Sequence, residues 1–170
     1  MIIKLCDRLH NMRTGDAWPE QKRRDKALET MEVYAPIAHR LGMQKIKWEL
    51  EDLSLLYLDP DGYRAITDAL EARMPTLEKF MDEMRTQIRE RLELDGVHAT
   101  ISSRIKHIYS IYRKMYAQKL DINGIFDLCA FRVIVDTIPD CYNVLGIIHD
   151  MYKPLPGRFK DYISTPKPNM

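Results

Sequence analysis

The chain has 170 residues, and its 26 Lys or Arg nearly balance its 25 Asp or Glu, so the formal net charge is only +1. This composition allows one domain or two small ones with a buried core, but it excludes a general nucleic-acid coat, and we expect no DNA partner. Because no apolar run approaches the roughly 18 residues of a membrane span, no signal-peptide pattern is present and the three cysteines are scattered, we expect a cytoplasmic protein without membrane contact or a disulfide framework.

The first 94 residues are predicted to be almost entirely helical, because their apolar residues recur at a period of about 3.6. Pro36 should kink the second helix, since its ring nitrogen cannot donate to the carbonyl of Glu32. Gly42 should end that helix, and the sequence Asp-Pro-Asp-Gly at 59–62 should stop the next one. The predicted helices cover residues 2–13, 22–41, about 46–57, 63–73 and 76–94.

After Gly96 the apolar period changes from about 3.6 to 2. Residues 97–102 alternate between apolar and polar, which predicts a half-buried strand, and a helix follows at about 106–118. Residues 128–135 form a nearly continuous apolar run rich in β-branched side chains, which predicts a well-covered strand. A helix at 140–152 and a further strand would complete an α+β fold in which helices pack on a mixed sheet.

A basic segment follows the first predicted strand. Between Ser103 and Lys119 there are five Lys or Arg and no Asp or Glu. On a helix, one quarter of the circumference would carry cations and a hydroxyl, and the opposite side would carry apolar groups. The polar side comprises Lys106, Ser110, Arg113 and Lys114, and the apolar side Ile108, Ile111, Tyr112 and Met115.

Asp127 stands at the start of the apolar run that follows this segment. Cations beside one carboxylate suit a polyphosphate with Mg²⁺, because Mg²⁺ is usually held by one or two carboxylates together with substrate phosphates. A solvated basic helix face is the plainer interpretation, and spacing alone does not decide between the two.

Two further groups of polar residues are candidates on weaker grounds. Asp7 and Asn11 are four residues apart and share one side of the first helix, where an ordinary surface pair is the simpler interpretation. The segment 153–161 is rich in Pro, Gly and cations, and Lys167 and Asn169 follow it. Without further information this segment is best interpreted as a surface loop.

Three stretches of the sequence resemble the synthetase domain of the RelA/SpoT family: residues 103–115, 126–135 and 156–169. Residues 4–14 and 34–42 resemble the end of the hydrolase domain in the same family. These enzymes make and degrade guanosine tetra- and pentaphosphate in the stringent response. The resemblance implies that residues 1–95 are the last helices of an HD-type hydrolase domain with a helical linker. Residues 96–170 would be the first part of a synthetase domain, with a truncated nucleotidyltransferase-like mixed sheet.

The resemblance also implies a reaction, the transfer of pyrophosphate from ATP to the 3′-hydroxyl of GDP or GTP. The basic form of the segment Arg158–Asp161 is similar to family members that carry both synthesis and hydrolysis. The implied site comprises ATP-binding Arg104, Lys106, Ser110 and Lys114, the catalytic Mg²⁺ ligand Asp127, and GDP/GTP-binding Lys160, Lys167 and Asn169.

For the hydrolase, the resemblance implies Asp7 as a Mn²⁺ ligand and Asn11 and Thr14 near the nucleotide. The other metal ligands lie upstream in the family, so we expect no tight Mn²⁺ site in this chain. A guanine-stacking aromatic residue and a catalytic glutamate follow Asn169 in the family, so we expect weak or no turnover from this chain alone. The resemblance also allows ribosome association of the full-length protein.

Two other functions remain open from the sequence. A non-catalytic RNA- or nucleotide-binding module is suggested by Tyr109, Tyr112 and Tyr116, which are interleaved with Arg and Lys as in stacking surfaces. Tyr112, however, lies on the predicted packing face. The third hypothesis is a regulatory module whose helical half links two catalytic domains.

Overall fold

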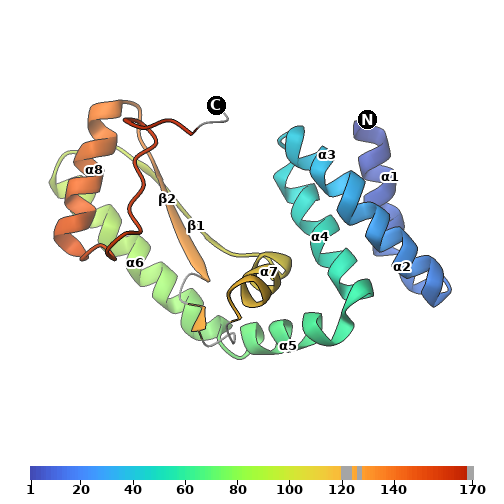
Figure 1. The fold of residues 1–170 in the computed structure, drawn as a ribbon. Coiled ribbons are helices and arrows are strands. Elements are labelled where there is room, and N and C mark those ends of the chain that lie inside the picture. Colours follow the sequence, from blue (N-terminus) through green and yellow to red (C-terminus); the bar gives the residue numbers. More distant parts are fainter. Residues whose placement is uncertain (120–123, 126–127, 168–170) are drawn as a thin grey trace. The chain divides into compact units, whose positions relative to one another are not determined.

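A computed structural model describes residues 1–119, 124–125 and 128–167 of the chain (Figure 1). They fall into two compact units, residues 1–79 with 104–130, and residues 80–103 with 131–170. The α-helices and strands of the described part are, in chain order, α1 (Ile2–Arg13), α2 (Glu20–Glu29), α3 (Ala35–Arg40), α4 (Gln44–Leu58), α5 (Pro60–Glu71), α6 (Met74–Leu94), β1 (Thr100–Ile105), α7 (Ile108–Gln118), β2 (Cys129–Ile134) and α8 (Ile138–Met151). The predictions of a helical segment 2–94 and of a strand within 128–135 are both confirmed.

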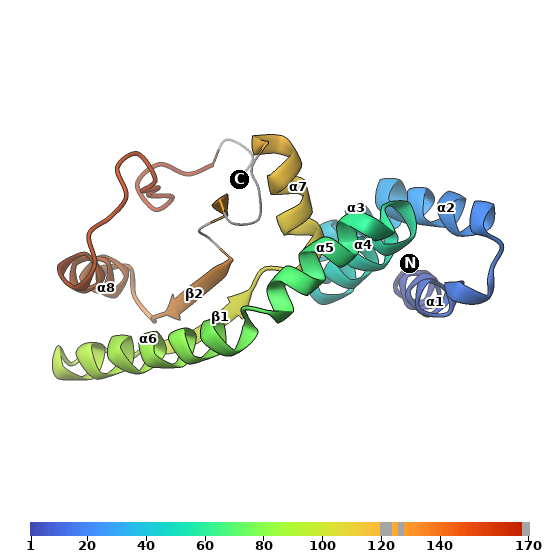
Figure 2. The same ribbon diagram turned by 90° about the horizontal axis from the view of Figure 1, so that it is seen from below.

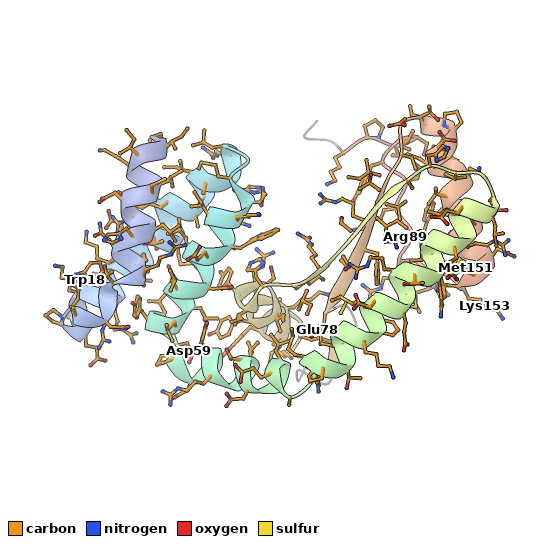
Figure 3. All side chains as sticks on the ribbon, turned by 180° about the vertical axis from the view of Figure 1, so that it is seen from behind. Trp18, Asp59, Glu78, Arg89, Met151 and Lys153 are labelled. Carbon is orange, nitrogen blue, oxygen red and sulfur yellow. The ribbon has the colours of Figure 1, made fainter. Side chains whose placement is uncertain are left out.

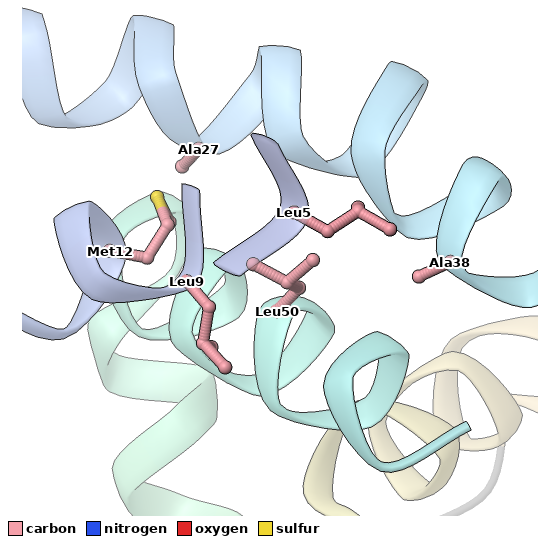
Figure 4. Close-up of a cluster of buried hydrophobic side chains, with 6 residues drawn as sticks. All are labelled: Leu5, Leu9, Met12, Ala27, Ala38 and Leu50. Carbon is pink, nitrogen blue, oxygen red and sulfur yellow. The ribbon is translucent and has the colours of Figure 1, made fainter. Parts of the chain in front are cut away.

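The first four helices share one apolar core in the first unit (Figure 4). Its centre is formed by Leu5, Met12 and Leu50, which are fully buried. Small side chains on the covering helices let the backbones approach closely, with Ala27 on α2 and Ala38 on α3. Burying aliphatic side chains of this size stabilises the fold by roughly 1.5–3 kcal/mol each. Helix α4 is therefore held firmly by α1, α2 and α3.

The single helix predicted for residues 22–41 is divided in two. A π-helical turn at Thr30–Tyr34 separates α2 from α3. The cause is Pro36, which has no N–H to donate and whose ring crowds the preceding turn. Gly42 then ends α3 with a φ of +73°, and Met43 N donates to Ala38 O at 2.9 Å. The predicted helix end at Gly42 is thus confirmed, and its φ is one that glycine adopts without strain.

The junction between α4 and α5 is set by Asp59 (Figure 3). Its Oδ1 accepts a hydrogen bond from Gly62 N at 2.9 Å, and Pro60 occupies the first helical position. The predicted stop at 59–62 is therefore a one-residue break, and α5 begins at Pro60 rather than at residue 63. Asp59 Oδ2 also accepts from the Tyr112 hydroxyl at 2.8 Å, which joins α7 to this junction.

Gly62→Ala is expected to destabilise the fold by roughly 1–3 kcal/mol, as other overpacking substitutions do. A methyl group at position 62 would lie 2.5 Å from Asp59 Oδ2 and 2.8 Å from Tyr112 Cε2, so the cap and the hydroxyl contact could not both survive. Gly146→Ala on α8 is the matched control, because nothing lies within 4 Å of its added methyl group. Urea unfolding should show a loss for Gly62→Ala and no loss for Gly146→Ala. Equal stability of the Gly62→Ala protein and the wild type would contradict this description of the junction.

A second core in the first unit packs α7 on α5. Its buried residues are Ile66, Leu70, Ile111, Ile125 and Leu128, and Ile108, Tyr112 and Met115 pack against them. These residues of α7 are the ones predicted to face inward, so the packing side of the basic helix is confirmed. The cationic side is left facing away from this core.

The second unit has its own core between α6, α8 and the strands (Figure 2). Ile88 and Leu92 of α6 pack with Val144 and Ile147 of α8, and Met151 lies beside them (Figure 3). At its edge Arg91 binds both Asp95, at 2.9 Å, and Asp150, at 3.0 Å. This unit is thus a helix pair covering a small sheet.

The two strands β1 and β2 pair in an antiparallel sheet, which confirms the α+β class. The first strand lies at Thr100–Ile105 rather than at 97–102, and α7 begins at Ile108 rather than at 106. The reason is that Lys106 N donates to Leu128 O at 2.9 Å, so the sheet pairing continues past Ile105. The described residues after α8 form no strand, so the third strand of the predicted mixed sheet is not seen there. The predicted domain boundary at residue 95 stays a prediction.

None of the helices in the described part of the chain combines the length and apolar character that crossing a membrane requires.

Candidate functional site

A cavity of about 420 Å³ opens in the first unit beside the end of β1 and the start of α7. Its described lining holds five Lys or Arg side chains and no carboxylate. The structure brings the four predicted ATP-binding residues together here, and their role in binding ATP stays a prediction. The lining consists of Lys47, Trp48, Arg104, Ile105, Lys106, His107, Ser110, Arg113, Lys114 and Ala117.

Two elements present the predicted residues. Arg104 comes from the end of β1, and the backbone of Lys106 is fixed by its bond to Leu128 O. Ser110, Arg113, Lys114 and Ala117 occupy positions i, i+3, i+4 and i+7 of α7, so they share one face. The amphipathic pattern of α7 therefore places one face in the core and the other in the cavity.

Helix α4 supplies a wall that the sequence analysis missed. The Trp48 ring centroid lies 5.0 Å from Arg104 Cζ, and the Trp48 and His107 rings stack at 5.5 Å with 23° between their planes. The sequence predicts only a helix at about 46–57 and does not single out Trp48. No local pattern signals these contacts, because the partners are far apart in the sequence.

Glu51, one turn after Trp48, lies behind the lining. Its Oε2 is 3.1 Å from His107 Nε2 and its Oε1 is 3.4 Å from Lys47 Nζ. Ser110 Oγ lies 3.0 Å from the same ring nitrogen and 3.2 Å from Nδ1. Glu51 is only 8% exposed, so it is a buried carboxylate between two basic side chains. The network fixes the His107 ring at the cavity edge.

Asp52 caps α7 from a different helix. Its Oδ1 accepts from Tyr109 N at 2.7 Å, whereas the N-cap residue His107 makes no side-chain capping bond of its own. A carboxylate at a helix N-terminus is favoured by the dipole and by the unpaired N–H groups. Burial nevertheless raises the pKa of Asp52, although the backbone bonds from Tyr109 and Ile108 and the nearby His107 oppose the change.

Asp52→Asn should therefore gain stability relative to the wild type as the pH rises. A carboxyl whose pKa is raised on folding stabilises the fold most when protonated, and this contribution is lost as the pH rises through the folded-state pKa. The loss begins above about pH 4, the usual pKa of an unfolded Asp. Urea unfolding of both proteins across acidic and neutral pH measures the difference, with Asp68→Asn as an exposed control on α5. If the wild type instead gained stability relative to Asp52→Asn as the pH rises, burial would not be the dominant influence on the pKa of Asp52.

The lining residues do not by themselves fit a metal ion, since they are cations and neutral groups. Glu51 is already engaged by two basic side chains. Asp127, the predicted Mg²⁺ ligand, lies outside the described residues.

The predicted GDP/GTP-binding residues belong to the second unit. Lys160 lines a cavity of about 320 Å³ with Tyr142 and Phe159, and Lys167 Nζ lies 4.6 Å from the Tyr162 ring centroid. Asp161 orders this loop, because its Oδ1 accepts from the backbone N–H groups of residues 163 and 164. Those bonds, that of Ser164 foremost, lower the pKa of Asp161. Asn169 lies outside the described residues.

The predicted hydrolase residues lie on and after α1. Asn11 Nδ2 donates to Asp7 Oδ2 at 3.2 Å, and both line a cavity of about 420 Å³ with Trp18 and cationic side chains. Thr14 is not in that lining; its hydroxyl donates to His10 O at 3.0 Å. The described residues contain no group of three or more His, Cys, Asp or Glu able to hold a metal. Asp7 and its described neighbours therefore do not fit a Mn²⁺ site.

Comparison with known proteins covers both ends of the chain. Residues 103–170 match the family model of a region found in RelA/SpoT proteins, and residues 1–44 match that of the HD domain. These matches define a protein that joins HD-domain and RelA/SpoT sequence in one chain. The chain is therefore similar to RelA/SpoT proteins in the segment 103–170 and to HD domains in the segment 1–44.

Some relatives are named as pyrophosphokinases and one as a pyrophosphohydrolase. The chain is 47% identical over 170 residues to a GTP pyrophosphokinase of Myxococcus xanthus and 46% identical over 170 residues to one of Streptomyces coelicolor. It is also 46% identical over 170 residues to a probable guanosine-3′,5′-bis(diphosphate) 3′-pyrophosphohydrolase of Synechocystis. The alignments cover 99–100% of this chain but only 20–22% of those proteins. The chain thus spans about a fifth of the length of the curated relatives it matches.

Proposed function

We propose that this chain carries the ATP-binding part of a GTP pyrophosphokinase, which transfers pyrophosphate from ATP to the 3′-hydroxyl of GDP or GTP. The observation that carries the proposal is the cavity beside α7, whose described lining has five cations and no carboxylate. A triphosphate is the substrate group that such a lining suits, because charge-assisted bonds to phosphate are short and strong.

In this proposal the cations of the cavity act on the donor. Lys106, Ser110 and Lys114 bind the phosphates of ATP, and Arg104 faces the base and the phosphates. The 3′-hydroxyl oxygen of the acceptor forms a bond to the β-phosphorus of ATP and releases its proton to water, the bond from that phosphorus to the α,β-bridging oxygen breaks, and AMP leaves. The cations offset the negative charge of the transferred group, and positioning and electrostatics supply most of the rate in such reactions.

The metal and the second activity are part of the same proposal. The two family matches suggest a requirement for divalent metal. We assign Mg²⁺ to Asp127 for synthesis, where it would offset phosphate charge, and Mn²⁺ to the hydrolase of the longer protein, with Asp7 as one ligand. Lys160, Lys167 and Asn169 are proposed to hold the acceptor, and Asn11 and Thr14 to lie near the hydrolase nucleotide. The cytoplasm as location is a prediction from the sequence composition, and the ribosome as partner of the full-length protein is a prediction from the family.

The RNA-binding alternative is less well supported by the geometry. Tyr112 packs in the second core and donates to Asp59, so its ring is not available for stacking on a base. Tyr109 and Tyr116 contact Tyr112, with ring centroids 6.4 and 4.4 Å from it. Tyr109 and Tyr112 therefore stack on each other, the Tyr116 ring is tilted against Tyr112, and the cations line the cavity instead.

Binding experiments with the 170-residue chain separate the two functions. We expect Mg-ATP to bind with a 1:1 ratio in calorimetry at low salt. We expect single-stranded RNA to bind weakly and to be displaced by Mg-ATP. Tight RNA binding with a steep salt dependence and no response to Mg-ATP would support the RNA-binding module instead.

Catalysis can be tested by extending the chain. The residues that follow the aligned segment in the Myxococcus xanthus relative would be joined after Met170, and transfer from ATP to GDP would be measured by chromatography. We expect transfer by the extended chain and none by its Asp127→Asn variant. Full activity of that variant would show that Asp127 is not the metal ligand.

A further inference from the structure

Arg104 is the most exposed of the four predicted ATP-binding residues. It lies near the end of β1, and its side chain is exposed. A long exposed side chain of this kind loses rotamer freedom when it is fixed, which opposes binding. A group that fixes Arg104 before the nucleotide arrives would therefore strengthen binding without touching the nucleotide.

Trp48 is placed to be that group. Its ring centroid lies 5.0 Å from Arg104 Cζ, inside the roughly 6 Å range of cation–π attraction, in which Trp is the strongest partner. The planar guanidinium also stacks well on an aromatic face, unlike a lysine ammonium. The contact joins α4 to the end of β1 inside the first unit.

The Trp48 ring is itself well supported. It stacks with the His107 ring at 5.5 Å, and His107 is held by Glu51 at 3.1 Å. The neighbouring residues Leu50 and Leu55 of α4 are almost completely buried, so the helix is packed firmly. A side chain on a packed helix sets a direction more precisely than one on a loop.

We propose that Trp48 is a positioning residue of the nucleotide cavity, which holds the Arg104 guanidinium in the direction needed to receive a nucleoside triphosphate. The inference rests on the proposed function of this cavity as the ATP site. In this proposal Trp48 acts through Arg104.

The proposal is tested by a double-mutant cycle in Mg-ATP binding to the whole 170-residue chain. Trp48→Leu should weaken binding by about 3- to 10-fold, the range expected for losing a cation–π contact and its preorganisation. Trp48→Phe keeps a ring and should restore most of the affinity. In an Arg104→Ala background, Trp48→Leu should change the affinity by less than about 2-fold. A purely structural role of Trp48 would give the same loss in both backgrounds.

Tryptophan emission gives a second readout. The chain has two tryptophans, Trp18 and Trp48, so Trp18→Phe leaves only the ring in question. We expect Mg-ATP to change the emission of that variant at the same midpoint as calorimetry. In Trp18→Phe with Arg104→Ala, the emission change should be lost or shifted to the weaker affinity.

The outcomes separate this inference from the proposed function. If Mg-ATP fails to bind the folded wild type, the ATP site is wrong and the inference falls with it. If Mg-ATP binds and Arg104→Ala weakens it, but Trp48→Leu does not, only the inference is wrong. Equal losses from Trp48→Leu in both backgrounds would also overturn it.

Discussion

Lys106→Ala is expected to weaken Mg-ATP binding by about 10- to 100-fold, because one charge-assisted bond to phosphate contributes roughly 1.5–3 kcal/mol. Lys106 lines the cavity and its backbone N–H is bound to Leu128 O, a bond that alanine retains. The substitution therefore removes the ammonium group while the pairing at the end of β1 is kept. Calorimetry at low salt measures the loss, and thermal unfolding checks that the variant is folded.

Lys45→Ala is the matched control for this prediction. Lys45 is an exposed residue of α4 that does not line the cavity. Lys45→Ala changes the net charge by the same amount as Lys106→Ala. We expect it to change the affinity by less than about 2-fold, since exposed charges act weakly through water. If both variants bind Mg-ATP equally, the effect comes from overall charge and the cavity is not the phosphate site.

The sequence was sufficient to predict the parts of this site that depend on one element. The face of α7 that carries Ser110, Arg113 and Lys114 follows from helical periodicity, since the apolar positions on the other side must pack. The helical half and the ends at Gly42 and Gly96 follow from equally local rules, and both glycines have positive φ. Sequence patterns predict these features because the interactions that determine them lie within one helix or at its end.

The parts that failed depend on contacts between distant segments. The start of α7 was placed two residues early because the bond from Lys106 N to Leu128 O could not be known from periodicity. The wall formed by Trp48 and the cap formed by Asp52 were missed for the same reason. Both residues lie on α4, where spacing indicates only an amphipathic helix. Tertiary partners decide which of its polar residues matter.

Glu51→Ala should produce the largest loss of stability among these substitutions, about 3 kcal/mol or more. Removing one partner of a buried ion pair leaves the others desolvated and uncompensated, which is costlier than losing a surface pair. Glu51 is 8% exposed and contacts both Lys47 and His107. Urea unfolding measures the change.

Glu49→Ala, on the same helix, is the matched control for the loss of a surface pair. Glu49 binds Arg13, with Arg13 Nη2 and Glu49 Oε2 2.8 Å apart, but both side chains are well exposed, so the expected loss is about 1 kcal/mol or less. Similar losses from Glu49→Ala and Glu51→Ala would show that Glu51 is not effectively buried.

Glu51→Gln separates stability from binding. The amide keeps the size of the side chain, but the negative charge behind the cavity is gone, and the described lining contains no other. We expect a less stable protein that binds Mg-ATP about 2- to 5-fold more tightly at low salt. The gain comes from removing the repulsion between the carboxylate and the phosphates. It is modest because charges several ångströms apart interact at an effective dielectric constant between those of protein and water. A tenfold loss of affinity would instead mean that Glu51 holds Lys47 or His107 in the geometry that binds phosphate. In the expected case, the carboxylate stabilises the fold at a cost in affinity for the nucleotide.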